Sequence, residues 1–182
     1  MVCQGWGMAL LRQAAFSADR QHRWWLQRCW NPVQPQLLFI GLNPSRADGE
    51  RDDPTLRRLM GFARAWGFGG LDVLNLFAFC SASPAVLRRS SDPVGAENDD
   101  CLQRGLAAAE ALWLGWGNHG AWRQRDQQVL DLMALQLSAA VPLLALGLTA
   151  SGQPRHPLYA PAAAQPLRLQ HPGEVRPLAP CR

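Results

Sequence analysis

Four polar clusters in this sequence combine residue types that can hold a ligand and act on it. In the first, residues 41–45 (GLNPS), Gly41 lets a ligand approach the backbone and Pro44 fixes a turn, which leaves the Asn43 amide projecting. The second is Asn75, whose amide offers a donor and an acceptor, as the edge of a nucleobase requires. A turn that closes a strand and an amide bonded to a loop backbone are the structural alternatives.

The third and fourth clusters add an aromatic ring and a histidine. Trp116 lies between two glycines and is followed by Asn118; the alternative roles are a packed core residue for Trp116 and a helix cap for Asn118. Thr149 precedes a basic loop in which Arg155 and His156 stand before a proline. A histidine held in this way can donate to a developing anion or contact a phosphate, whereas a lone loop histidine is often without a function.

Short apolar runs precede these clusters and predict the strands that position them. Each run ends near Gly, Pro, Asn or Phe, and longer helical patterns separate the runs, which is typical of βα units with a parallel sheet. The runs are residues 37–42, 71–76, 111–114 and 141–146. Ligands bind outside the carboxyl ends of parallel strands, so the four clusters fall where a shared site is expected.

The segments between the runs predict helices on both faces of this sheet. Helices are expected to begin at Asp53-Pro54, ending near Gly67, and at Ser83-Pro84, because a polar N-cap precedes proline in both places. Two more are expected over residues 96–110 and 121–137. The aromatic segment 24–30 is expected to add an antiparallel edge strand, and the Pro/Ala-rich tail from residue 161 to be irregular. The fold class is therefore α/β, with three α/β/α layers around a four-stranded, mainly parallel sheet.

Length and composition indicate the number of domains and the class of protein. A chain of 182 residues with 48% hydrophobic and 18% charged residues is typical of one folded domain, with a core over about 23–160 and a tail over 161–182. The absence of a long apolar run or of a signal-peptide pattern predicts a cytoplasmic protein without a membrane partner. The oligomeric state is left open.

The cysteines and the basic residues indicate which kinds of site and partner the sequence favours. Five scattered cysteines without a CxxC pair favour neither a disulfide framework nor a metal site, and no cofactor motif is present. All 18 basic residues are arginine, and the net charge is +4. This charge admits a polyanionic partner, because guanidinium grips phosphate in a bidentate way, but a genomic codon bias also explains the missing lysine.

The order of these motifs resembles the uracil-DNA glycosylase superfamily. Its loop after the first core strand, its LLN segment, its LWGxxA segment and its HPSP loop are matched by residues 41–45 (GLNPS), 73–75 (VLN), 114–118 (LGWGN) and 156–158 (HPL). Over a longer span the chain resembles a mostly bacterial family, the domain of unknown function 1643 family. The matching positions are Asp48, Asp53-Pro54-Thr55, Pro93, Gly95, Glu97-Asn98-Asp99 and residues 156–159 (HPLY).

These resemblances imply a three-layer domain that binds a nucleobase, a nucleotide or a nucleic acid. Asn43 would orient a water toward the anomeric carbon, Asn75 would read the base edge, and His156 would stabilise negative charge on the departing base. Leu158 would act as a wedge in the base stack. The ligand-binding residues would be Gly41, Pro44, Ser45, Asn75, Phe77, Trp116, Asn118 and Thr149.

Charged residues near these loops leave two functions open. Arg46 and Arg155 would contact phosphate, together with Arg57 and Arg58 in a binding domain. The acidic residues Asp48, Glu50, Asp52 and Asp53 would repel DNA but suit a small nucleotide ligand or a role as general bases, with Asp48 the catalytic candidate. The chain is thus either an N-glycosylase-type enzyme or a non-catalytic nucleotide or nucleic-acid binding domain. An α/β-hydrolase, a zinc protease and a P-loop enzyme are disfavoured, because their motifs are absent.

Overall fold

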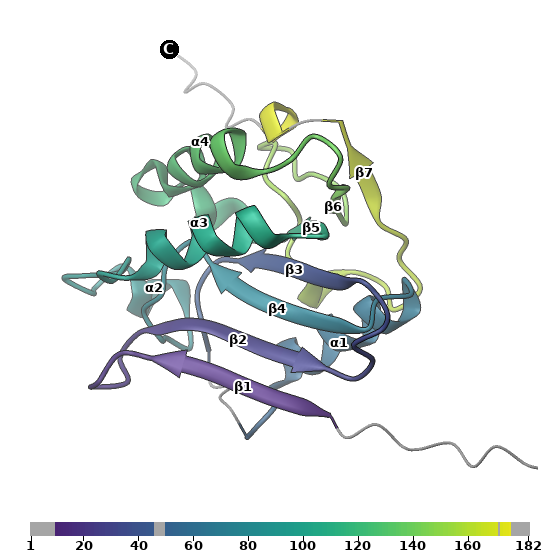
Figure 1. The fold of residues 1–182 in the computed structure, drawn as a ribbon. Coiled ribbons are helices and arrows are strands. Elements are labelled where there is room, and N and C mark those ends of the chain that lie inside the picture. The colour runs from purple at the N-terminus through teal and green to yellow at the C-terminus, as the bar shows by residue number, and fades with distance from the viewer. Residues whose placement is uncertain (1–9, 46–49, 171, 176–182) are drawn as a thin grey trace, which may run out of the picture.

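Seven strands form one mixed sheet in the order β1-β2-β4-β3-β5-β6-β7 (Figure 1). The computed structural model describes residues 10–45, 50–170 and 172–175. The strands are β1 Leu11–Phe16, β2 Arg23–Cys29, β3 Gln36–Gly41, β4 Gly70–Asn75, β5 Ala111–Leu114, β6 Leu143–Ala145 and β7 Leu167–Leu169. The protein is therefore a mixed α/β structure.

The four strands predicted from apolar runs form the parallel centre of this sheet. β3 pairs with β4 on one side and with β5 on the other, and β5 pairs with β6, all in parallel register. Every residue of β5 and β6 is buried, which is why these strands read as continuous apolar runs rather than alternating ones. Their carboxyl ends share one edge of the sheet.

The predicted strand number of four is too small, because antiparallel strands extend the sheet on both sides. The segment 24–30 does form an antiparallel strand, β2, on β4. It is not the edge of the sheet, since β1 pairs with its outer side. The tail after residue 161 is not wholly irregular either, because β7 pairs with β6. Three residues are too few for a recognisable alternation, so β7 left no signal in the sequence.

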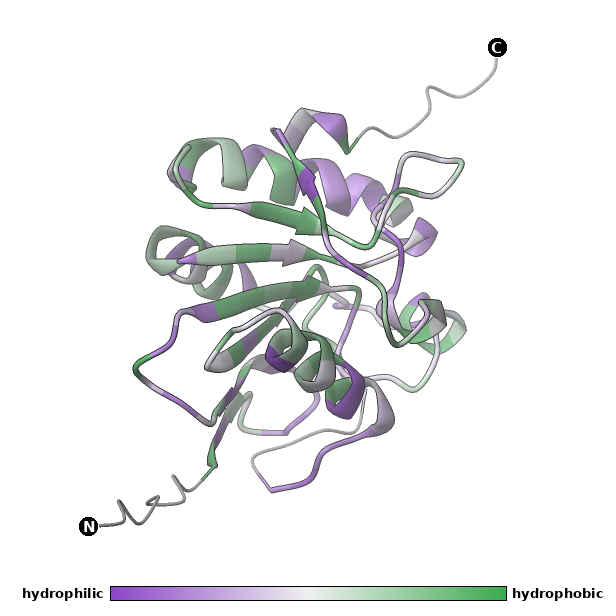
Figure 2. Ribbon diagram, turned by 90° about the vertical axis from the view of Figure 1, so that its right-hand side faces the viewer, coloured by the Kyte–Doolittle hydropathy of each residue, from purple (hydrophilic) through white to green (hydrophobic). Residues whose placement is uncertain are grey.

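Helices cover both faces of the sheet (Figures 1 and 2). α1, Pro54–Ala65, packs on one face through Leu56, Leu59, Met60 and Ala63, which recur at helical spacing. α3, Asn98–Ala108, and α4, Arg125–Gln136, cover the other face. Figure 2 shows green, hydrophobic strands in the centre and purple, hydrophilic segments outside. None of the helices in the described part of the chain has the length and apolar composition needed to cross a membrane.

Two helices begin where their predicted N-cap residues stand. One predicted helix begins later than expected. Asp53 caps α1 by accepting from the Leu56 N–H at 2.7 Å, and Ser83 caps the short helix α2, Pro84–Leu87. The helix expected over 121–137 starts instead at Arg125. Before it, a 3-10 turn spans Asn118–Gln124 and is kinked, because Arg123 and Gln124 adopt positive φ angles of 56° and 55°.

Candidate functional site

The four polar clusters converge at the carboxyl edge of β3, β4, β5 and β6. Two cavities lie there, a groove of about 810 Å³ and a small cavity of about 40 Å³. Asn43 and His156 line both cavities, Asn75 lines only the small one, and Trp116 lines only the groove. Residues from the first and last cluster, 113 positions apart in the sequence, thus share one site. The parallel order of the central strands produces this meeting.

The Asn43 side chain is held by the loop that follows β4. Its Nδ2 donates toward the Pro44 carbonyl at 2.9 Å, the Ser81 carbonyl at 3.0 Å and the Ser81 hydroxyl at 2.9 Å. Ser81 is itself buried, and its N–H donates to the Pro44 carbonyl at 3.0 Å. With the amide nitrogen engaged in this way, Oδ1 is the Asn43 atom available to a ligand or water as an acceptor.

Asn75 differs from Asn43, because its amide nitrogen has no hydrogen-bond partner among the described residues. The side chain is 3% exposed, and Nδ2 is buried without a hydrogen bond. A buried donor left unpaired costs about 1–3 kcal/mol. Its cavity of about 40 Å³ has room for water and not for a nucleobase, since one water takes about 30 Å³ of liquid volume. In the structure as it stands, the Asn75 amide is therefore separated from the groove.

His156 lines both cavities, and its burial favours the neutral form of the imidazole. It caps the 3-10 turn Pro157–Tyr159, where Nδ1 accepts from the Leu158 N–H at 3.2 Å. Burial lowers the pKa of His156 below 6.5, because the charged form loses hydration. A neutral ring whose Nδ1 accepts must carry its proton on Nε2, so that atom is a donor. His156 thus supplies a donor to the two cavities into which Asn43 brings an acceptor.

Trp116 lines the groove but is a packed residue. It is 1% exposed, and its indole N–H donates to Gln153 Oε1 at 2.6 Å. Gln153 Nε2 in turn donates to Asp126 Oδ2 at 2.7 Å, and both residues are buried. This network ties the loop after β5 to α4 and to the loop before His156. Neither Gln153 nor Asp126 stood out in the sequence, because each lies far from its partners along the chain.

The other expected ligand-binding residues divide between the cavities and the core. Thr149 and Asn118 both line the groove and are joined by a hydrogen bond of 2.6 Å from the threonine hydroxyl. Ser45 lines both cavities. Phe77 lines neither cavity; it is fully buried and packs against Trp122 with ring centroids 5.1 Å apart. Phe77 is therefore placed as a core residue.

Gly41 and Pro44 shape the site through their backbone. A Cβ at Gly41 would lie 2.8 Å from the Phe39 ring and 3.1 Å from Asn75 Oδ1, so only glycine leaves the small cavity open. Pro44 lines neither cavity, and its carbonyl accepts from Asn43. The two residues hold the first loop in the position that brings Asn43 to the groove.

The charged candidates contribute unequally. Arg155 is exposed on the groove, where its Nε donates to the Leu148 carbonyl at 3.0 Å. Asp53 lines the small cavity while capping α1 and accepting from the Ser45 hydroxyl. Arg58, by contrast, is occupied with the carbonyls of Pro157 and Ala160. The candidates Arg46 and Asp48 lie outside the described residues.

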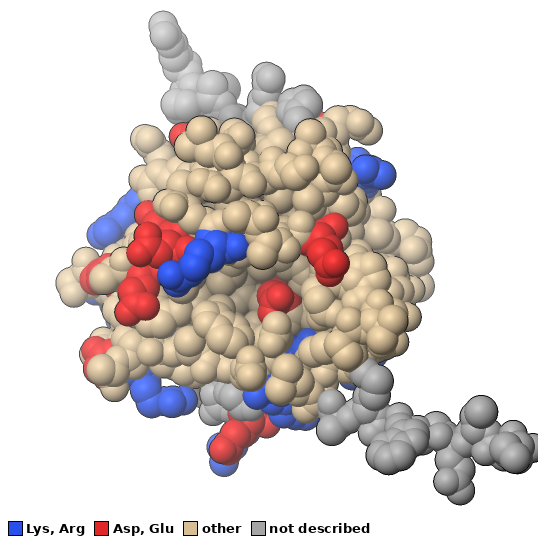
Figure 3. All heavy atoms as spheres, viewed as in Figure 1, with Lys and Arg blue, Asp and Glu red and all other residues tan. Residues whose placement is uncertain are grey.

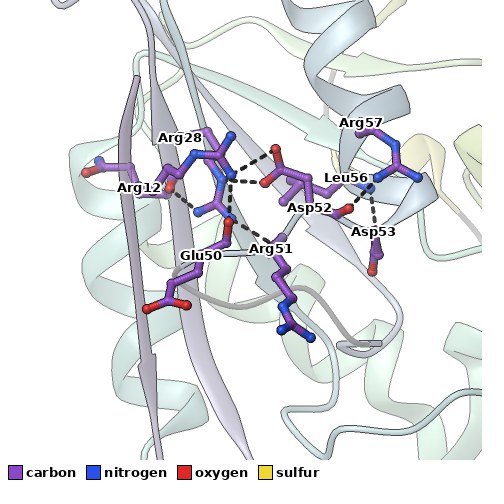
Figure 4. Close-up of polar contacts among 9 residues, drawn as sticks. Arg12, Arg28, Glu50, Arg51, Asp52, Asp53, Leu56 and Arg57 are labelled. Atoms are coloured by element: carbon purple, nitrogen blue, oxygen red, sulfur yellow. Dashed lines mark hydrogen bonds and ion pairs between the residues drawn. The ribbon is translucent and has the colours of Figure 1, made fainter. Parts of the chain in front are cut away.

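The acidic loop before α1 is paired with arginines of the outer strands (Figure 4). Arg28 is fully buried, and its Nε donates to Asp52 Oδ1 at 2.8 Å. Arg12 reaches Asp52 Oδ2 at 3.2 Å and the Glu50 carbonyl at 2.9 Å. Arg57 donates to the Asp52 carbonyl at 2.6 Å. The charge of Asp52 is thus neutralised inside the protein and does not face the groove.

The segment 97–99 (END) holds the carboxyl end of β4. Asn98 is fully buried, and its Nδ2 donates to the carbonyls of Asn75 at 3.2 Å and Leu76 at 3.0 Å. Arg125 at the start of α4 donates to the Leu76 carbonyl at 2.7 Å and pairs with Asp99. These residues position Asn75 without touching either cavity.

Comparison with known families gives a match over most of the chain. The profile of a family described as "Protein of unknown function (DUF1643)" matches residues 23–158, which include β2 to β6 and every lining residue of the small cavity. Searches of curated proteins and of solved structures gave no match. Within the described ranges, no group of three or more His, Cys, Asp or Glu side chains is placed to hold a metal ion. On the length of the profile match, which covers most of the chain, the protein belongs to the DUF1643 family.

Proposed function

We propose that this protein hydrolyses the N-glycosidic bond of a nucleobase-containing ligand bound in the groove. The observation that carries the proposal is that Asn43 and His156 line the same two cavities. Hydrogen bonds to the protein orient both side chains, so that Asn43 Oδ1 can accept and His156 Nε2 can donate. The resemblance of residues 41–45 and 156–158 to the two ends of a uracil-DNA glycosylase-like site supports it.

The proposed reaction uses one water and no group beyond the chain. Asn43 Oδ1 accepts a hydrogen bond from the water and directs its oxygen toward the anomeric carbon. A C–O bond forms as the C–N bond breaks, and the electron pair of that bond leaves with the base. His156 donates to the base while its negative charge builds, which lowers the transition state more than the ground state. The proton lost by the water ends on the base or in the solvent.

Base recognition by Asn75 requires the small cavity to open toward the groove. The unpaired Nδ2 of Asn75 supports this role, because a ligand acceptor would satisfy a donor that is otherwise buried at a cost. Ser45 and Thr55 line both cavities and so form part of the boundary between them. Asp48 as general base, Arg46 on phosphate and Leu158 as a stacking wedge remain parts of the same proposal.

A non-catalytic nucleotide or nucleic-acid binding domain is the second candidate. The neutral polar lining of the groove favours it, since Ser83, Asn118 and Thr149 offer hydrogen bonds with no charge and Arg155 offers one cation. Such a lining can bind a nucleotide without activating water. The two candidates differ in what Asn43 does.

Single-turnover base release, measured beside a binding titration, separates the candidates. Substrates are oligonucleotides containing uracil, hypoxanthine or a mismatch, together with the corresponding nucleosides. Asn43→Ala should abolish release but change ligand affinity by less than about tenfold, because orienting water matters mainly in the transition state. Wild-type protein that binds tightly but releases no base would favour the binding domain. Protein that does neither would refute both candidates.

The salt dependence of binding tests the role of Arg155. Replacing it with alanine should reduce the slope of log affinity against log salt by about one, if it contacts a phosphate. Arg64→Ala is the matched control, because this exposed arginine lies in the last turn of α1 and does not line the groove. Its guanidinium group stacks over Trp30. An unchanged slope in Arg155→Ala would remove it from the phosphate site.

A further inference from the structure

A separate cavity of about 250 Å³ opens between α3 and the sheet, near the amino ends of the parallel strands. It shares no lining residue with the groove or the small cavity. Figure 3 shows a hollow on this face of the molecule, with acidic and basic side chains at its rim. Nothing in the proposed glycosidic chemistry uses this cavity.

Small residues at the carboxyl end of α3 and just after it shape this cavity. Gly105 lets the helix approach β4 closely, since a Cβ there would lie 2.6 Å from Leu74 Cδ1. One turn later, Ala108 and Ala109 leave room above the sheet. Trp25, Leu38 and Leu74 line the cavity from the strands β2, β3 and β4. The cavity therefore has a largely apolar floor.

Charged groups of both signs also line this cavity, and they do not form ion pairs with one another. Asp72 comes from β4, Arg104 from α3, and Glu110 from the residue before β5. Within the described residues, none of the three takes part in an ion pair within 4 Å. Glu110 accepts from the Gln36 N–H at 2.7 Å, and Arg104 contacts the Cys101 sulfur at 3.3 Å.

Asp72 is the group whose position needs an explanation. Burial raises the pKa of its carboxyl group, and a hydrogen bond from Gln27 offsets only part of this effect. An ionised carboxylate in a largely apolar cavity costs stability unless hydrogen-bond donors or an opposite charge meet it there. Lining the same cavity, Arg104 would meet a group of the opposite charge on the same ligand.

We propose that this cavity binds a small zwitterion with an apolar body, such as a free amino acid with a hydrophobic side chain. Its ammonium group would bind Asp72, its carboxylate would bind Arg104, and its side chain would lie against Trp25 and Leu74. The volume of about 250 Å³ lies below the range of about 300–1,000 Å³ that is usual for drug-sized ligands, which favours a compact molecule of this kind.

Binding of L-phenylalanine, followed by calorimetry and by NMR shifts of the Trp25 indole, tests the proposal. Phenethylamine and 3-phenylpropionate are the matched probes, because each lacks one of the two charges. Asp72→Asn and Arg104→Gln should each weaken L-phenylalanine binding by at least about tenfold, the equivalent of one charged hydrogen bond. Asp72→Asn should leave 3-phenylpropionate binding unchanged, and Arg104→Gln should leave phenethylamine binding unchanged.

Control variants separate loss of the site from loss of the fold. Ala109→Leu should abolish binding by filling the cavity, whereas Asp131→Asn and Arg64→Gln change exposed charges elsewhere and should have no effect. Circular dichroism of each variant checks folding. No saturable binding to folded wild-type protein up to about 10 mM, weaker than any affinity of interest, would overturn the proposal. Binding that survives Ala109→Leu, or that ignores both charge variants, would also overturn it.

Discussion

At the scale of single residues, two asparagines of the site are prepared in opposite ways. Asn43 has three acceptors within 3.0 Å of its amide nitrogen, so its orientation is set before a ligand arrives. Asn75 keeps a buried amide nitrogen with no partner in the described structure. A held acceptor suits the orientation of water, and an unpaired donor suits the recognition of a ligand atom.

The unpaired donor predicts a trade-off between stability and function. Asn75→Leu removes the buried amide while keeping the number and branching of the side-chain heavy atoms, and we expect it to raise the free energy of unfolding by up to about 1–3 kcal/mol. The same variant should lose affinity for any base-containing ligand. Urea unfolding and a ligand titration measure the two effects. A variant that is less stable than wild type would show that the amide is satisfied in solution.

The histidine predicts a pH-dependent loss of stability. Well above pH 6.5, His156 is neutral in both the folded and the unfolded states and contributes nothing to the pH dependence. As the pH falls below 6.5, the unfolded chain gains a proton that buried His156 resists, so stability falls until the lowered folded pKa is reached. His156→Gln should therefore lose less stability than wild type between about pH 7 and pH 5.

Urea unfolding across that pH range measures the difference. His119→Gln is the matched control, because His119 is an exposed histidine on the same groove. Equal slopes for wild type and His156→Gln would show that the imidazole protonates as readily in the folded protein as in the unfolded chain.

At the scale of elements, helices from one face of the sheet hold the strand end that carries the site. Asn98 in the first turn of α3 and Arg125 in the first turn of α4 both donate to the Leu76 carbonyl, directly after β4. These bonds place a helix start beside a strand end, as happens in βα architectures. Residues that contact no ligand can thus set the position of Asn75.

Removing the hydrogen bonds from Asn98 to the end of β4 should lower both the free energy of unfolding and the affinity for a ligand. Asn98→Ala leaves the Asn75 carbonyl without its side-chain donor and should lower the free energy of unfolding by about 1–3 kcal/mol. Its exposed neighbour provides the control, since Glu97 makes no capping hydrogen bond and Glu97→Ala should be nearly neutral. Urea unfolding compares the two, and equal stabilities would mean that these hydrogen bonds are not needed.

At the scale of the whole molecule, the antiparallel strands β1 and β2 stabilise a loop on which the site depends. Arg12 and Arg28 from these strands bind Asp52, one residue before the cap of α1 (Figure 4). Asp53 and Thr55, which line the small cavity, follow directly. The outer strands therefore act on the site through the loop 50–53, at a distance from the groove.

Asp52→Asn should destabilise the protein strongly, because Arg28 is fully buried and would lose its counter-charge. Breaking a buried ion pair from one side costs about 3–5 kcal/mol. Asp131→Asn, on the exposed face of α4, should have little effect. The double variant Arg28→Leu, Asp52→Leu should recover part of the loss, since it leaves no uncompensated charge at this buried ion pair. Denaturant midpoints of the three variants check this, and a double variant no better than Asp52→Asn would count against the ion pair.

The sequence alone predicts the centre of the protein and the place of its candidate site. The four parallel strands and the starts of α1 and α2 were predicted correctly, because apolar runs, N-caps and helix-first prolines are encoded within a few residues. The convergence of Asn43, His156 and Asn75 followed from strand order, since carboxyl ends of parallel strands share an edge. The four polar clusters thus predicted the location of the two cavities.

Only the tertiary structure decided what the side chains do there and where the sheet ends. β1 and β7 depend on pairing with a neighbour, and such pairing is not encoded in a segment of three to six residues. The partner of Asn43 is Ser81, 38 residues away, and Trp116 is satisfied by Gln153, 37 residues away. Hydrogen-bond partners of this kind are set by packing and not by local spacing, which is why the sequence named the residues of the site but could not assign their contacts.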